Sequence, residues 1–265
     1  CNIQVAAGAG TVMQSLKLST AQFGAVTACG FLSGAFLGIA AGGWADKIGI
    51  KKVLNLALIV SILGCVWRIY SNSFATLFIS MFLIGVSMAA LNANSTKILA
   101  MWFHPSQMNL AMSIYIACST IGAVIALSTT PRILTAGGTM QKVYTIGAAT
   151  VVAATVLWII FARVKPTGAP DIKSEPVMKY IGSVIKLKNL WLNAITMFCI
   201  MGLFITCSSF MVVTFTNFKG IDPVTAGNYS TATSLIAVPL MIIMPVIFTK
   251  MRWIKKGVIT LLVVG

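Results

Sequence analysis

The sequence predicts an all-α membrane protein, built as a bundle of transmembrane helices. Hydrophobic residues make up 58% of the 265 residues and charged residues only 9%, and the mean hydropathy is +0.95. A soluble domain of this length could not bury so much apolar surface, so we expect lipid to cover most of it. Basic residues also outnumber acidic ones, 19 to 4.

Long runs without Lys, Arg, Asp or Glu supply the expected membrane crossings. A helix needs about 20 apolar residues to cross the hydrocarbon layer, and helices are expected because lipid offers no partner to an unpaired backbone. We count seven complete crossings and a partial one at each end, so we expect the chain to be a fragment. The complete crossings are 18–45, 53–67, 69–96, 108–128, 143–162, 189–218 and 223–249, and the partial ones are 1–13 and 257–265.

The positions of the basic residues predict how the chain is threaded. If successive crossings alternate, 14 of the 19 basic residues fall in one set of connections; the other set holds Lys17, Arg68, Arg132, Lys142 and Lys219. The positive-inside rule places the larger set in the cytoplasm. We therefore expect a multi-pass protein of the inner or plasma membrane with cytoplasmic Lys-rich loops. The net charge of +15 then reflects topology and not nucleic-acid binding.

The longest polar connection, 164–188, divides the chain. We expect 1–163 to be an N-terminal half of six helices with the first one truncated. Residues 164–188 form a cytoplasmic linker, and 189–265 hold two complete helices and part of a third. From Pro176 onward the linker carries an amphipathic basic pattern, which fits a helix on the anionic inner leaflet and a solvated linker about equally well.

The two parts of the chain also resemble distant copies of one another. Ile50-Lys51-Lys52 follows one crossing and Ile254-Lys255-Lys256 follows another, 204 residues later. Both copies fall at the same topological place, and repeated helical halves are how many secondary transporters are built.

The connection at 42–54 carries the most specific motif. It resembles the signature G-x-L-A-D-R-x-G-R-K-x-x-L of major facilitator superfamily transporters, from which Trp44 and Ile50 depart and in which Lys47 conservatively replaces Arg. The matching residues are Gly42, Ala45, Asp46, Gly49, Lys51 and Leu54. The resemblance implies roughly twelve helices in two pseudo-symmetric halves, with this chain running from late helix one to early helix nine. It also implies a secondary carrier that works by alternating access.

A conformational-switch loop is expected in this motif, formed by Gly42, Asp46, Lys47, Gly49, Lys51 and Lys52. Asp46 lies where a helix ends, so it can pair with Lys47, Lys51 or the N-terminus of a neighbouring helix. Gly49 permits a turn that other residues avoid. The resemblance implies that the loop clamps the two halves together in the outward-facing state. The alternative is that Asp46 only balances the Lys-rich loops.

Four glycines recur at every fourth position and mark one stripe of a helix: Gly30, Gly34, Gly38 and Gly42. Small residues at this spacing let helices approach closely in lipid. In the family this helix slides against the opposite half, and static packing within one half explains the stripe equally well.

The resemblance implies a solute cavity between the halves near mid-membrane. Polar residues on the helices that would line it are Gln4, Asn92, Asn94, Tyr115, Ser119, Thr206, Ser208 and Tyr229. Asn92 and Asn94 lie about 200° apart on a helix, so at most one is expected to face the cavity while the other bonds a neighbouring helix. For each residue of the list, a hydrogen bond between helices is the competing explanation.

The sequence argues against an enzyme and offers no resident cofactor or metal site. His104 is the only histidine, and the six cysteines have no C-x-x-C spacing. Many proton-coupled relatives carry R-x-x-x-G in the fourth helix, but Met81 precedes Gly85 here. Lys97 could attract an anionic solute, although a snorkelling lysine is the simpler reading.

We expect a monomer whose partners are a small solute, the lipid bilayer and, if transport is coupled, an ion. Uniport, symport and exchange stay open, and a small organic or inorganic anion is the suggested solute. The alternative function is a non-transporting membrane receptor on the same fold.

Overall fold

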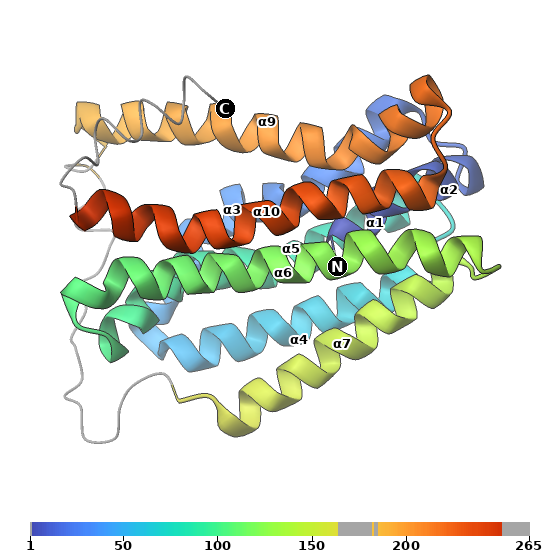
Figure 1. The fold of residues 1–265 in the computed structure, drawn as a ribbon. Coiled ribbons are helices and arrows are strands. Elements are labelled where there is room, and N and C mark those ends of the chain that lie inside the picture. Colours follow the sequence, from blue (N-terminus) through green and yellow to red (C-terminus); the bar gives the residue numbers. More distant parts are fainter. Residues whose placement is uncertain (1, 164–181, 183–184, 251–265) are drawn as a thin grey trace.

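Long helices account for nearly all of the computed structural model, which describes residues 2–163, 182 and 185–250. Seven helices of 20 residues or more lie in this part of the chain and agree with the seven complete crossings predicted. They are α3 (Thr20–Ile48), α4 (Ile50–Ile69), α5 (Phe74–Trp102), α6 (Met108–Thr135), α7 (Met140–Phe161), α9 (Lys188–Lys219) and α10 (Pro223–Lys250) (Figure 1). Shorter elements are α1 (Asn2–Ala7), α2 (Ala9–Ser15) and the 3₁₀ turn η1 (Pro105–Gln107).

Two predicted elements, the linker helix from Pro176 and the partial crossing 257–265, lie outside the described residues. Among the described residues, five helices are long and apolar enough to cross a membrane. They are α3, α4, α5, α7 and the stretch Pro105–Thr135 that includes α6. Large apolar side chains such as Phe36 and Phe161 are more than 70% exposed on the bundle. Such a surface suits lipid and not water, which agrees with the membrane class predicted from composition.

The helix starts follow local sequence signals. Ser19 forms the capping box suggested by Ser19-Thr20-Ala21-Gln22: its hydroxyl accepts from the Gln22 amide at 3.2 Å, and the Gln22 side chain accepts from the Ser19 amide at 2.9 Å. Ser73 and Thr76 form a second box at the start of α5. These side chains satisfy amides that have no partner inside the helix, so the helices begin at defined residues.

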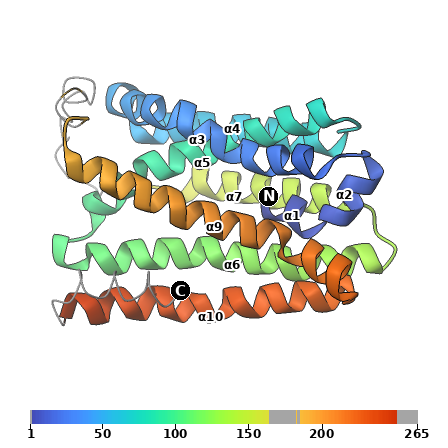
Figure 2. The ribbon, with the colours of Figure 1, turned by 90° about the horizontal axis from the view of Figure 1, so that it is seen from above.

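The bundle has two ends, which we name by their charge. The Lys-rich end carries the α3–α4 turn, η1 and the start of α9. The opposite end carries the connections 16–19, 70–73, 136–139 and 220–222. We call α1 to α7 the first group and α9 with α10 the second group. In both views α10 lies alongside α6 (Figures 1 and 2), so the two groups touch along these helices.

The core of the first group lies between α3, α4 and α5. Gly85 of α5 crosses α3 so closely that a Cβ at this position would overlap Ser33 and the Gly30 carbonyl. Close crossings of this kind need small residues at the contact, since lipid provides no hydrophobic force to press helices together. Gly30 of the predicted stripe therefore serves packing within the first group.

Candidate functional site

The site is built on the tight turn that joins α3 and α4. Gly49 is the one residue between the two helices, and its φ of 95° lies in the region that side chains rarely adopt. Its amide donates to the Ala45 carbonyl at 3.0 Å, and its carbonyl accepts from the Val53 amide at 3.3 Å. The turn thus has the geometry that the motif predicted for Gly49.

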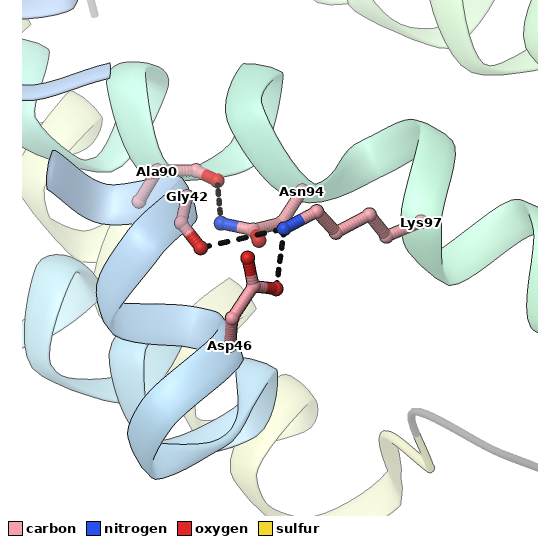
Figure 3. Close-up of polar contacts among 5 residues, drawn as sticks. All are labelled: Gly42, Asp46, Ala90, Asn94 and Lys97. Carbon is pink, nitrogen blue, oxygen red and sulfur yellow. Dashed lines mark hydrogen bonds and ion pairs between the residues drawn. The ribbon is translucent and has the colours of Figure 1, made fainter. Parts of the chain in front are cut away.

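Asp46, one turn earlier, forms an ion pair with Lys97 of α5. The ammonium lies 2.6 Å from Asp46 Oδ1, and it also donates to the Gly42 carbonyl at 3.3 Å (Figure 3). The Asp46 side chain is 6% exposed and that of Lys97 is 32% exposed. The Coulomb attraction is therefore less screened than at an open surface.

The sequence suggested other partners for Asp46, and the structure corrects this. Lys47 and Lys52 are exposed, and the Lys51 ammonium donates to the Ile159 carbonyl at 3.5 Å, near the C-terminus of α7. A cation suits that position because the last carbonyls of a helix carry partial negative charge. Lys51 and Asp46 thus tie α4 to α7 and α3 to α5.

Asn94 lies next to the ion pair and is fully buried. Its amide nitrogen donates to the Ala90 carbonyl of its own helix at 2.9 Å. The hydrogen bond to a neighbouring helix that the sequence suggested is therefore not formed by this nitrogen. Figure 3 shows the Asn94 amide and the Asp46 carboxylate pointing toward one another. Asn94 Oδ1 and Asp46 Oδ2 are buried and accept no hydrogen bond from the residues that the structure describes. These two oxygen atoms can therefore accept a hydrogen bond from a further donor.

A groove of about 470 Å³ lies between α3 and α5, on the Lys-rich side of the Gly30–Gly85 crossing. It is lined by Gly30, Phe31, Gly34, Gly38, Ile39, Met88, Ala89, Asn92 and Ala93. Two separate predictions, the glycine stripe and the polar residue Asn92, meet on this one surface. Asn92 is exposed here while Asn94 is buried, as expected from their angular separation.

The four stripe glycines have different surroundings. A Cβ at Gly34 or Gly38 would meet no atom of the described residues within 4 Å, whereas one at Gly42 would just touch the Ala93 side chain at 4.0 Å. Gly30 is packed against Gly85. Half of the stripe is therefore a smooth open surface, and the rest packs inside the first group.

The other predicted cavity residues are dispersed. Tyr115 of α6 is half-buried and interacts with Ser95 of α5. Ser119 and Thr206 are exposed, and the Ser208 side chain lies outside what the structure describes. Tyr229 is 51% exposed and packs edge-on against Phe215 with ring centroids 6.1 Å apart. Of the predicted cavity residues whose side chains are described, only Asn92 lines the α3–α5 groove.

Gln4 points into the first group, where it meets a buried cation that sequence reasoning missed. Arg68 was expected in a connection, but it lies in the last turn of α4 and is 0% exposed. Its Nη2 donates to Gln4 Oε1 at 3.2 Å, its guanidinium lies 4.5 Å from the centre of the Tyr144 ring, and its Nη1 lies 4.0 Å from Met81 Sδ. Gln4 in turn donates to the Val143 carbonyl at 3.4 Å.

This arrangement joins α1, α4, α5 and α7 around one guanidinium. The planar cation can bond Gln4 at its edge and stack on Tyr144 with its face. Gly147 leaves room for the Gln4 amide, which a Cβ at this position would push aside. Gln4 thus acts between helices, the competing explanation from sequence. No sequence pattern announces the Arg68 environment, since its partners come from three distant segments.

Comparison with known families decides the identity of the fold. A family model described as Major Facilitator Superfamily matches residues 2–265. The chain belongs to the Major Facilitator Superfamily. No curated protein matches the chain. Membership agrees with the motif at 42–54 and with the long apolar helices, and it makes the protein a membrane transporter of small solutes and not an enzyme. In this superfamily protein, the motif loop, the Asp46–Lys97 pair and the adjoining groove form the candidate site.

Proposed function

We propose that the protein is a secondary carrier that moves a small solute across a cell membrane by alternating access, with its Lys-rich end in the cytoplasm. In this mechanism two rigid units rock against one another around a central site. The units are the predicted halves, of which the first group is one and the second group the described part of the other.

The observation that carries this proposal is a contrast between the contacts within and between the groups. Inside the first group, polar contacts cross-link the helices at both ends. These contacts are Arg68 with Gln4, Asp46 with Lys97, and the Trp158 indole N–H with Asn55 Oδ1 at 3.0 Å. Such ties favour movement of α1, α3, α4, α5 and α7 as one body.

Apart from the close packing of α6 against α10, the two groups meet through softer contacts. The ring of Phe23 on α3 packs edge-on against that of Phe210 on α9, with centroids 6.1 Å apart. Arg132 reaches Asn228 of α10 through a 3.4 Å hydrogen bond between exposed side chains. Both contacts lie toward the opposite end of the bundle. An exposed polar pair can separate at modest cost, which suits an interface that opens and closes.

We assign Asp46 the role of a clamp between the halves. Oδ1 is held by Lys97, while the buried Oδ2 is left to accept a donor from the second half when the Lys-rich ends come together. Lys97 then fixes the carboxylate in position within the first group. It gives no argument for an anionic solute, because its charge is already paired.

Flux measurements test the proposal. Full-length protein in liposomes should show saturable, ATP-independent uptake when a panel of radiolabelled metabolites is offered, and Asp46→Asn should reduce that uptake sharply while leaving insertion intact. Solute binding without flux in the parent protein would instead support the receptor alternative. Unchanged flux in Asp46→Asn would count against the clamp alone.

A further inference from the structure

The contact between α6 and α10 is the longest meeting of the two groups (Figures 1 and 2). At Gly227 the helices come so close that a Cβ would lie 3.1 Å from Pro131 Cγ and 3.3 Å from the Leu127 carbonyl oxygen. Gly227, Pro131 and the neighbouring Ala226 are buried. This crossing lies toward the opposite end of the bundle.

Two buried hydroxyl groups near this crossing, one on α6 and one on α10, have no partner among the described residues. Thr130 of α6 is 0% exposed, and its hydroxyl makes no hydrogen bond with the described residues. The hydroxyl of Thr231, one turn beyond Gly227 on the same face of α10, is likewise buried and unpaired in the described structure. Pro131 has no amide hydrogen, so the Leu127 carbonyl loses its usual donor within the helix.

The other buried threonines and serines among the described residues are satisfied. Thr155 of α7 is 2% exposed and donates to the Val151 carbonyl at 2.8 Å, and Ser80 of α5 is 0% exposed and donates to the Leu77 carbonyl at 2.7 Å. An unpaired hydroxyl in a buried site costs the free energy of removing it from water. Where the contact between α6 and α10 covers a hydroxyl, this cost is incurred while the two helices are together.

We propose that Thr130 and Thr231 weaken the α6–α10 closure, so that the two groups part readily at the opposite end. When the helices separate, water reaches both hydroxyls and the penalty disappears. The residues therefore shift the balance of conformations toward the open state without touching the solute. This inference rests on the proposed alternating access, since it concerns how easily one of the two states is left.

Replacement by valine gives a test with a definite sign. Valine has nearly the shape of threonine but no hydroxyl to desolvate, so Thr130→Val and Thr231→Val should favour the closed contact. The reporter is Gly24→Cys in full-length protein lacking its native cysteines; a Cβ there lies 4.0 Å from Phe210 Cζ, in the other contact between the groups. A membrane-impermeant maleimide added from the side of Lys17 labels this thiol when the groups part.

We expect each valine variant to slow labelling by about fivefold or more, the factor for the lower range of the cost of an unpaired buried hydroxyl. Thr130→Ser keeps the hydroxyl and should label like the parent. Thr155→Val, which removes a bonded hydroxyl inside the first group, should also leave the labelling rate unchanged.

Two results would overturn the inference in different ways. Labelling that is as fast or faster in both valine variants would show that the hydroxyls do not weaken the closure, while the proposed function would stand. A parent protein whose thiol is never labelled, with or without solute, would show that the groups do not part there, and both proposals would fail together.

Discussion

The Lys97 ammonium on α5 lies 2.6 Å from the Asp46 carboxylate on α3, and both residues belong to the first group. The motif aspartate is thus anchored within its own half before any contact with the other half is considered. The two partners differ in exposure, 6% for the Asp46 side chain and 32% for that of Lys97. The more buried partner, Asp46, is therefore expected to be the more costly one to leave without its counter-charge.

Removal of Lys97 should destabilise the protein more than neutralisation of Asp46. Lys97→Met leaves a buried carboxylate without its cation, at a cost of about 2–3 kcal/mol, reduced from that of a fully buried pair because Lys97 is partly exposed. Asp46→Asn leaves an ammonium that can turn toward water. Thermal unfolding in detergent measures both, and Asp46→Asn with Lys97→Met should recover most of the loss. Equal losses in the two single variants would contradict this explanation.

Gly85 should be far less tolerant of a methyl group than Gly34. Gly85→Ala places a Cβ into Ser33 and the Gly30 carbonyl, so we expect a loss of about 1–3 kcal/mol from overpacking. Gly34→Ala is the matched control, because its Cβ would meet nothing within 4 Å in the described structure. Melting temperatures in detergent distinguish the two. If Gly34→Ala melts normally but lowers flux, the open part of the stripe serves movement.

Arg68 should not be replaceable by lysine. The compact ammonium of lysine cannot both bond Gln4 and cover the Tyr144 ring, as the planar guanidinium does. We therefore expect Arg68→Lys and Arg68→Met each to lower stability by about 1–3 kcal/mol. Arg132→Lys, at an exposed arginine, should stay within about 0.5 kcal/mol of the parent. Full stability of Arg68→Lys would show that charge alone suffices at this position.

Exposed lysines at the two ends test the proposed orientation. Lys142 and Lys219 lie at the opposite end and Lys52 at the Lys-rich end, and all three are exposed. In intact cells an impermeant amine reagent should modify Lys142 and Lys219 but not Lys52, with mass spectrometry as the readout. Inverted vesicles should give the reverse pattern. Modification of Lys142 only from the cytoplasmic side would refute the positive-inside assignment.

The helices were predictable because lipid imposes a simple rule on composition. The uncharged runs located all seven long helices, and Ser19 and Gly49 announced a cap and a turn through local chemistry. Helix ends were less predictable: the run that begins at Ile69 became α5 only from Phe74. The uncharged runs show which residues lie in the apolar layer. The ends of a helix are set instead by the residues that cap its backbone amides and carbonyls.

The contacts between helices were not predictable from one sequence. Lys97 lies 51 residues from Asp46, and the sequence places both near the same end of their helices without showing that those helices are neighbours. Matching the depth of Asp46 and Lys97 in the two crossings could have suggested the pair. The surroundings of Arg68 could not be found in this way. Its partners Gln4, Met81 and Tyr144 carry no charge that would mark them in the sequence as partners of a cation.

The connection at Gly49 leaves no slack between α3 and α4. With a single residue between the last turn of one helix and the first turn of the next, the two helices cannot move far apart at this end. Lys51 connects α4 to the end of α7 through its hydrogen bond to the Ile159 carbonyl. The Asp46 carboxylate is therefore connected to α7 through a short covalent turn and one hydrogen bond.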